Sequence, residues 1–318
     1  MIFNLSSISE DPLGFLTTIL LYIPGMLLAI SIHESAHGWV AEKCGDPTAR
    51  YAGRITLNPV KHFDPMGFLC MFFVGFGWAK PVPVNPLLYK KYRKDDLKVS
   101  LAGIAANLCL FLICFIITQT LFTGALAKLP EYDFNKLLMS KTQEEIEESI
   151  VNGEKAYRIN DLTTDNYGKS VLSYGYLWNA DTLYESSSGF YRYISRSGNI
   201  ISAADIVVTP AFGKIVGILY QMLCYCMLIN LSLAVFNLIP LPPLDGYHVL
   251  NDLVLHQDLF AQRRTQQITG MVLIALIMIG NVKPEWDIIS IAINWVRGGI
   301  TSGLSSVTRS IAQSLGII

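Results

Sequence analysis

The pentapeptide HESAH at residues 33–37 combines residue types that bind a metal ion with one that can move a proton. His33 and His37 are four residues apart, so on an α-helix they lie on one face, one turn apart, where both imidazoles can reach the same ion. Glu34 follows His33 directly and lies beside the ion without having to bind it. This H-E-x-x-H spacing is typical of zinc sites that use the glutamate as a general base. The pattern therefore predicts a zinc site built for hydrolysis.

The pentapeptide lies at the end of a long apolar run, residues 13–40. Ionisable side chains inside such a run are costly and are candidates for function. The simpler alternative is a pair of polar residues at a helix end that reach towards water. The cost of burying these residues, together with their spacing, favours the metal site.

A catalytic zinc ion takes three protein ligands and keeps one position open for water. Asp245, in the stretch FNLIPLPPLDG, is the best candidate for the third ligand because it follows another long apolar run. The prolines before it stop the helix, and Gly246 permits an unusual turn. Asp245 could instead be the N-cap of a surface helix. The spacing alone leaves both interpretations open.

The composition indicates a membrane protein. The 318 residues are 52% hydrophobic and 15% charged, against about 25% charged in a typical soluble chain. The formal net charge of −1 gives no basic field for binding nucleic acid. The six cysteines have no zinc-ribbon spacing and are interpreted as reduced packing residues. Long apolar runs cover residues 13–40, 99–122, 212–239 and 268–280.

These runs predict an all-α polytopic membrane protein with about four to five transmembrane helices, plus a re-entrant or short β-like loop at 67–78. Lysines and arginines concentrate in residues 41–66 and 79–98, Arg54 among them, which places these regions in the cytoplasm. Four parts are expected: a first half of the catalytic core (1–122), an extracytoplasmic insertion (123–208), a second half of the core (209–281) and C-terminal interfacial helices (282–318).

In its motifs the sequence resembles the site-2 protease family of intramembrane zinc metalloproteases, in its compact bacterial branch. The matching stretches are HESAHGWVAEKCGDPTARYAGRITLNPVKHFDPMG, GFGWAKPVPVNP, GIAANL and FNLIPLPPLDG. The resemblance implies that His33, His37 and Asp245 bind one Zn²⁺ and that Glu34 is the catalytic base. Residues 103–107 read GIAAN, with alanine where many relatives have proline. The resemblance does not extend to residues 123–208 or to the tail after about residue 265.

Several polar residues are candidates for supporting roles. The resemblance puts Asn107 near the substrate or the oxyanion, although a packing hydrogen bond between helices would also explain it. Asn85, in PVPVNP, is a candidate for pairing with an extended substrate backbone. Weaker candidates, for ordering a loop or for supporting the metal ligands, are Asn58, His62, Asp64 and Asn237.

The predicted function is zinc-dependent hydrolysis of peptide bonds in or next to transmembrane segments, as in regulated intramembrane proteolysis. The alternative is a membrane metal-binding protein or transporter without proteolytic activity, but such a protein has no need of a base beside the metal. The expected partners are a transmembrane substrate, the lipid bilayer and a regulatory protein bound to 123–208. The expected location is a bacterial cell membrane, as a multi-pass protein, with the site towards the cytoplasm.

Overall fold

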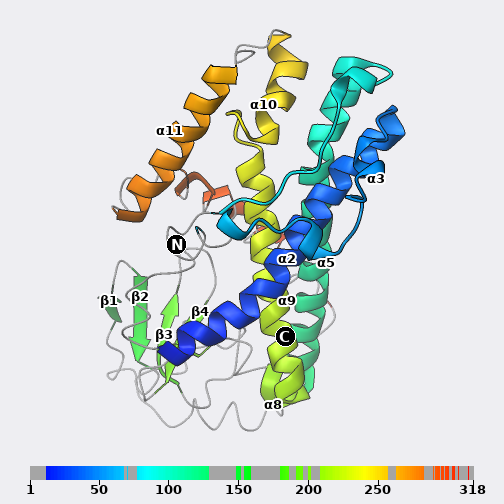
Figure 1. Ribbon diagram of the computed structural model, residues 1–318. Coiled ribbons are helices and arrows are strands. Elements are labelled where there is room, and N and C mark those ends of the chain that lie inside the picture. The colour runs from blue at the N-terminus through cyan, green and yellow to red at the C-terminus, as the bar shows by residue number, and fades with distance from the viewer. Residues whose placement is uncertain are drawn as a thin grey trace. The chain divides into compact units, whose positions relative to one another are not determined.

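The computed structural model describes residues 12–67, 70, 77–128, 208–256 and 263–282, together with five strands between 148 and 201 and scattered positions from 289 to 314. Most of these residues are helical (Figure 1). The predicted loop at 67–78 and the predicted interfacial helices at 282–318 lie largely outside the described residues.

Three described helices are long and apolar enough to cross a membrane: α2 (Pro12–Cys44), α5 (Tyr92–Lys128) and α9 (Lys214–Asn237). A shorter apolar stretch, Ile268–Ile279, lies within α11 (Arg263–Val282). Each of these four helices corresponds to one of the four apolar runs found in the sequence. The prediction of an all-α polytopic membrane protein is confirmed.

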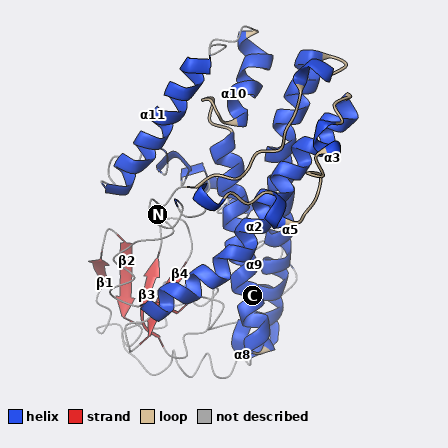
Figure 2. Ribbon diagram, in the orientation of Figure 1, coloured by secondary structure: helices blue, strands red, loops and turns tan. Residues whose placement is uncertain are grey.

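Short helices connect the long ones, as Figure 2 shows. Between α2 and α5 lie α3 (Thr48–Tyr51), η1 (Pro59–Lys61) and η2 (Pro86–Leu88). The short helix α8 (Thr209–Phe212) precedes α9. After α9 come α10 (Asp245–Leu250) and the π-helical turn η6 (Asn251–Leu255).

Residues 123–208 also contain a small antiparallel sheet, which adds a β element to the helical fold. Its strands are β1 (Glu148–Val151), β2 (Glu154–Arg158), β3 (Ala180–Glu185), β4 (Tyr191–Ser195) and β5 (Ile200–Ile201). They pair in sequence order as a meander. The register shifts between Ala180 and Thr182, where β3 pairs with β4.

The chain divides into two compact units. The first comprises Met1–Cys114 and Tyr225–Arg297, and the second comprises Phe115–Cys224 and Gly298–Ile318. HESAH and Asp245 both belong to the first unit. The site can therefore be described within that unit alone.

Close packing of α2 on α9 organises the first unit. Ile19, Tyr22, Met26 and Ala29 recur every three or four residues along α2 and form a buried cluster with Ile229 of α9. Beside this cluster, a Cβ atom added to Gly25 would lie 2.9 Å from the Cα of Cys226. The absence of a side chain at residue 25 therefore lets the two backbones approach closely, directly before the segment that carries HESAH.

Candidate metal centre

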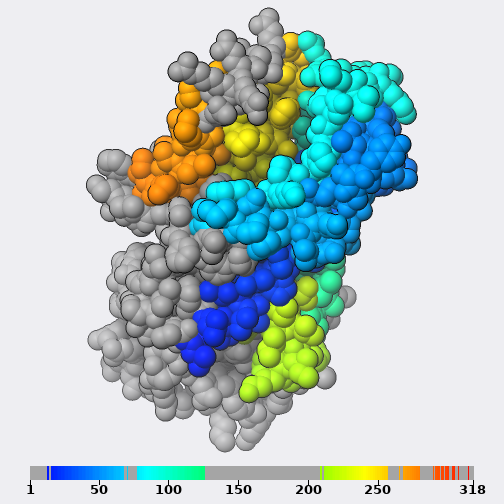
Figure 3. Space-filling model, in the orientation of Figure 1, coloured from blue at the N-terminus to red at the C-terminus, as the bar shows by residue number. Residues whose placement is uncertain are grey.

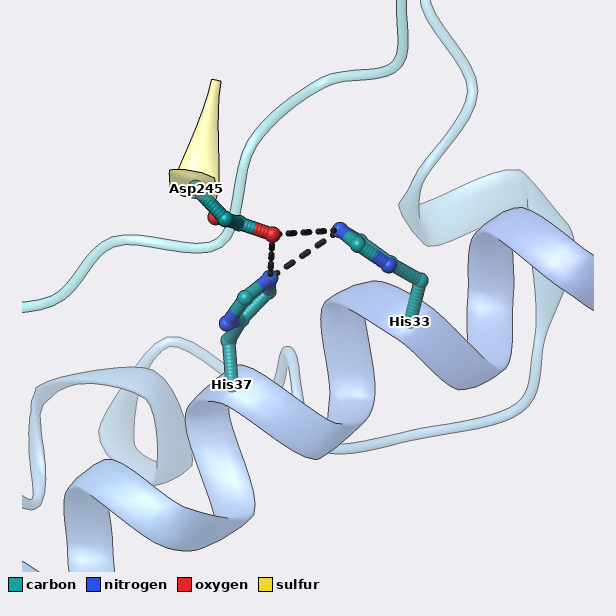
Figure 4. Close-up of side chains that lie close together, drawn as sticks. All are labelled: His33, His37 and Asp245. Atoms are coloured by element: carbon teal, nitrogen blue, oxygen red, sulfur yellow. Dashed lines mark hydrogen bonds and ion pairs between the residues drawn. The ribbon is translucent and has the colours of Figure 1, made fainter. Parts of the chain in front are cut away.

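Figure 4 shows His33 and His37 of α2 pointing towards Asp245 at the start of α10. The two Nε2 atoms are 3.0 Å apart. Asp245 Oδ2 lies 3.3 Å from Nε2 of His33 and 3.4 Å from Nε2 of His37. Among the described residues, these three form the one group of three or more potential ligand side chains whose ligating atoms converge.

The geometry of this group fits a zinc ion. Ligand atoms about 2.0–2.2 Å from a tetrahedral zinc are separated from one another by about 3.3–3.5 Å. The three observed separations, 3.0, 3.3 and 3.4 Å, are close to that range. Apart from these two imidazoles, Asp245 Oδ2 is buried without a hydrogen-bond partner among the described residues, and such an atom calls for a ligand. Two imidazoles and one carboxylate form a common set for catalytic zinc.

The outer nitrogens of both histidines face α5. Nδ1 of His37 lies 2.7 Å from the carbonyl oxygen of Val99 and donates its hydrogen to it, which leaves Nε2 free for a metal. Nδ1 of His33 lies 3.3 Å from Nδ2 of Asn107. Asn107 is fully buried, with 0% exposure. Helix α5 therefore contacts both rings at their Nδ1 atoms.

Gly103 makes room for the two imidazoles. A Cβ atom at this position would lie 2.4 Å from His37 Nε2 and 2.6 Å from His33 Cε1. Such distances are far below van der Waals contact, so any side chain at residue 103 would displace both rings. The first residue of the GIAAN motif is therefore a requirement of packing at the metal centre.

A tight turn between α9 and α10 presents Asp245 to the histidines. A Cβ atom on Gly246 would lie 2.3 Å from the carbonyl oxygen of Leu238, so only glycine allows the chain to double back here. Asp245 is the first residue of α10, and Leu244 is the N-cap. The carboxylate of Asp245 therefore does not cap its helix in the way that the alternative interpretation of the sequence required.

Glu34 is fixed by the segment that follows the predicted loop. The backbone N–H of Val82 donates to Oε2 of Glu34 over 2.8 Å. Arg54 binds the same segment, because its guanidinium donates to the carbonyl oxygens of Lys80 and Pro81, 2.6 and 3.2 Å away. The bond from Val82 uses Oε2, which makes Oε1, the second oxygen of the Glu34 carboxylate, the candidate for chemistry.

A largely apolar cavity of about 610 Å³ opens beside His33 and Glu34. Its wall on α2 reaches from Glu34 back to Tyr22, which is about 18 Å along a helix. Other parts of the lining come from α9 and from Gly270 and its neighbours on α11. Figure 3 shows the surfaces of α10 and α11, in yellow and orange, next to each other.

The remaining predicted residues mostly hold backbone. Asn58 accepts a hydrogen bond from the N–H of Val60, and Asp64 accepts one from Gly67. Asn85 likewise accepts a hydrogen bond from the backbone N–H of Leu87. The side chains of His62 and Asn237 bond to backbone carbonyl oxygens, those of Thr56 and Leu233 respectively. His62, Asp64 and Asn237 also line the cavity, whereas Asn58, Asn85 and Asn107 do not.

His248 lies one turn beyond Asp245 and contacts an acidic residue of α5. Its Nδ1 is 3.3 Å from Oδ2 of Asp96 on α5. The hydrogen bond to this carboxylate raises the pKa of His248 above its ordinary value. Asp96 therefore connects α5 to the helix that begins with Asp245.

Reasoning from the sequence missed two buried charged residues that support the site. Arg54 counted only as a cytoplasmic surface charge, yet it is 8% exposed and bonded to the segment that holds Glu34. Asp46 is fully buried, and its Oδ2 accepts the N–H of Asn85 over 2.6 Å. Both residues lie in the family-like stretch that follows HESAH, and their place in this stretch was the sequence feature that could have indicated a role at the site.

Comparison with known proteins assigns the chain to a family. Residues 21–280 match the sequence profile of "Peptidase family M50". The chain belongs to peptidase family M50. The match spans both HESAH and LPPLDG, so the converging residues lie inside the shared region.

Curated relatives in this family carry the name of zinc metalloproteases. The chain is 30% identical over 229 residues to "Putative zinc metalloprotease YwhC" of Bacillus subtilis, covering 72% of this chain and 67% of that protein. It is 31% identical over 119 residues to "Putative zinc metalloprotease Rip2" of Mycolicibacterium smegmatis, covering 36% of this chain and 46% of that protein. No solved structure matches the chain. The M50 assignment and the helices together identify a multi-pass membrane metalloprotease of the zinc type.

Proposed function

We propose that this M50 protein is an intramembrane protease of the site-2 type, which hydrolyses peptide bonds in or next to transmembrane segments during regulated intramembrane proteolysis. One observation carries the proposal: His33 and Glu34 belong to a helix that is apolar enough to cross a membrane, and they line the cavity beside it. A protease that acts on soluble proteins has no reason to bury its base and its metal ligands in such a helix.

The shape of the cavity supports an extended substrate. About 18 Å of cavity wall accommodates roughly five residues of an extended chain. A helix hides its own carbonyl groups in hydrogen bonds, so a transmembrane substrate has to unwind locally before it is cut. Substrates with helix-weakening residues near the cleavage site are therefore expected. The apolar lining favours the side chains that such segments carry.

In the proposed mechanism His33, His37 and Asp245 hold the zinc ion, which when bound polarises the scissile carbonyl and lowers the pKa of water. The N–H of Val82 holds Oε2 of Glu34, so Oε1 accepts a proton from the attacking water. The water oxygen forms the new bond to the carbonyl carbon. Glu34 then passes this proton to the amide nitrogen as the C–N bond breaks, which leaves a carboxylic acid and an amine, and the acid finally loses its remaining proton to the amine.

Asn237 is the asparagine with the best position for contact with a substrate, because it lines the cavity. Its amide nitrogen donates to the carbonyl of Leu233 over 3.0 Å and has a second hydrogen to offer. Asn85 remains a candidate for binding substrate backbone. We also propose that the segment 123–208 binds a regulatory partner and that the site opens towards the cytoplasmic side of a bacterial membrane.

Cleavage of tagged transmembrane substrates co-expressed with the protein tests the proposal. We expect Glu34→Gln to abolish cleavage and to retain zinc, whereas His33→Ala and Asp245→Ala lose zinc. Glu42→Gln is a matched control, since Glu42 lies on the same helix and binds Arg50 at the surface. Equal cleavage by wild type and Glu34→Gln would refute the protease mechanism. Full zinc affinity in Asp245→Ala would refute the ligand set.

A further inference from the structure

Asn107 is a fully buried amide that contacts a candidate zinc ligand and does not line the substrate cavity. The His33 ring lies between it and the ion that Nε2 would bind. A group in this position cannot reach a scissile carbonyl, but it can control the orientation and the tautomer of the imidazole. The relevant question is which hydrogen bond the amide makes with Nδ1 of His33.

The tautomer of His33 decides which hydrogen bond its Nδ1 can make. Nε2 of His33 faces His37 and Asp245, 3.0 and 3.3 Å away, so it is the nitrogen that has to give its lone pair to the metal. A neutral imidazole then carries its hydrogen on Nδ1, which becomes a donor. His37 already follows this arrangement, because its Nδ1 donates to the carbonyl of Val99.

The amide of Asn107 needs the opposite orientation to complete the same arrangement at His33. With Nδ2 3.3 Å from Nδ1, two donors face each other, and Oδ1 of Asn107 is buried without a partner among the described residues. Rotating the amide by half a turn exchanges its oxygen and nitrogen, which occupy nearly the same space. The oxygen then accepts the Nδ1–H of His33. The two donors then no longer face each other, and Oδ1 of Asn107 has a partner.

For the rotated amide nitrogen we expect the backbone carbonyl four residues earlier as the acceptor. Asn230 and Asn237 on α9 both donate from Nδ2 to the carbonyl oxygen four residues earlier, at 2.8 and 3.0 Å. The residue four before Asn107 is Gly103, whose missing side chain already makes room for the histidines. In the GIAAN motif, Gly103 and Asn107 are four residues apart and lie on one face of α5. Gly103 would then both leave space for the histidine rings and offer its carbonyl oxygen to the amide of Asn107.

We propose that Asn107 is a positioning residue for the metal centre: its side-chain carbonyl accepts the Nδ1–H of His33, which fixes the ring and directs Nε2 to the zinc ion. This arrangement replaces the role near the substrate or the oxyanion that the resemblance implied for Asn107. The inference rests on the proposed metal centre and not on the identity of the substrate.

Zinc affinity of the purified full-length protein, measured by competition with a chromophoric chelator, tests the inference. We expect Asn107→Leu to bind zinc about 10–100-fold more weakly, as is typical when a partner of a ligating histidine is lost. Asn107→Asp retains an acceptor oxygen but no donor, so its affinity is expected to stay within a few-fold of wild type. Asn230→Leu is the control, because it removes another fully buried asparagine from a spanning helix and should leave zinc affinity unchanged.

The outcomes separate the inference from the proposed function. Wild-type affinity in Asn107→Leu overturns the inference, and so does a loss in Asn107→Asp as large as in Asn107→Leu, since the amide would then act as a donor. If Asn107→Leu does not fold, Asn107→Ala replaces it with the same expectation. A wild-type protein that binds no zinc would overturn the metal centre as well. A protein that binds zinc but cuts no membrane substrate would refute only the proposed proteolysis.

Discussion

Substituting Gly103 by alanine should disturb the metal centre without touching any proposed ligand. The new Cβ atom would lie 2.4 Å from Nε2 of His37, whereas ordinary contact begins near 3.4 Å. The His37 ring therefore has to retreat by about 1 Å, and the His33 ring, with atoms 2.6 and 2.7 Å away, by somewhat less. Distances in a zinc site tolerate changes of only about 0.2 Å.

The strain should appear mainly in the metal-bound state. Without metal the two imidazoles can rotate away, whereas with metal they are held between the ion and α5. Overpacking a well-filled site costs about 1–3 kcal/mol. If this cost falls on the metal-bound state, zinc affinity decreases by about 5–150-fold. Proteolysis at limiting zinc should decrease by the same factor.

Chelator competition on the purified protein measures this decrease. Gly124→Ala is the matched control, because Gly124 lies on the same helix and its added Cβ would meet only Phe212 Cζ at an ordinary 3.6 Å. Both substitutions raise helix propensity equally, so that contribution cancels. Equal zinc affinity in the two variants would show that α5 does not press on the histidines as described.

Three further perturbations test other parts of the site. Val82→Pro removes the N–H that holds Glu34, which should lower kcat by about 10–150-fold with zinc content unchanged, because a hydrogen bond to a charged group contributes about 1.5–3 kcal/mol; an unchanged kcat would contradict this role. Gly270→Leu fills cavity space where an added Cβ meets only Pro243 at 3.8 Å, so substrates with bulky residues should be cut more slowly relative to those with small ones, and an unchanged ratio would argue against this wall of the cavity. Burial and the negative charge of Asp96 raise the pKa of Asp252 to about 6, so folded-state stability falls as pH rises from about 4 to about 6. Asp252→Asn should raise the thermal midpoint at pH 8 and give no gain at pH 4; an equal gain at both pH values would exclude this cause.

The part of the site that was predictable from the sequence is the part encoded by local geometry. His33 and His37 meet because residues four apart share a face of any α-helix. The apolar runs gave the spanning helices for a similar reason, since length and hydropathy decide whether a helix can cross a bilayer. Asp245 was different, because its spacing also suited a helix cap. Only the resemblance to a known family favoured it as a ligand.

The rest of the site depends on long-range packing, which no local pattern encodes. In the sequence Arg54 does not differ from the other arginines near it. Its role depends on the backbone carbonyls of Lys80 and Pro81, which only the folded chain brings within hydrogen-bond distance. The resemblance implied a place for Asn107 near the substrate or the oxyanion, and its position in α5 does not indicate which side of His33 it contacts. The sheet in 123–208 was missed because its strands are short and lie between turn-rich stretches. For Arg54 and Asn107 the partner is far away in the sequence.

Helix α5 shows how a spanning helix can govern a metal centre to which it gives no proposed ligand. Val99, Gly103 and Asn107 recur every four residues and therefore form one row along the helix. The first accepts a hydrogen bond from His37, the second leaves space for both rings, and the third contacts His33. This row meets a pair on α2 that is also spaced by four, as in helices that pack ridge against groove. Sliding α5 by one turn, about 5.4 Å, would break all three contacts together. The geometry of the metal centre is therefore coupled to the packing register of two membrane helices.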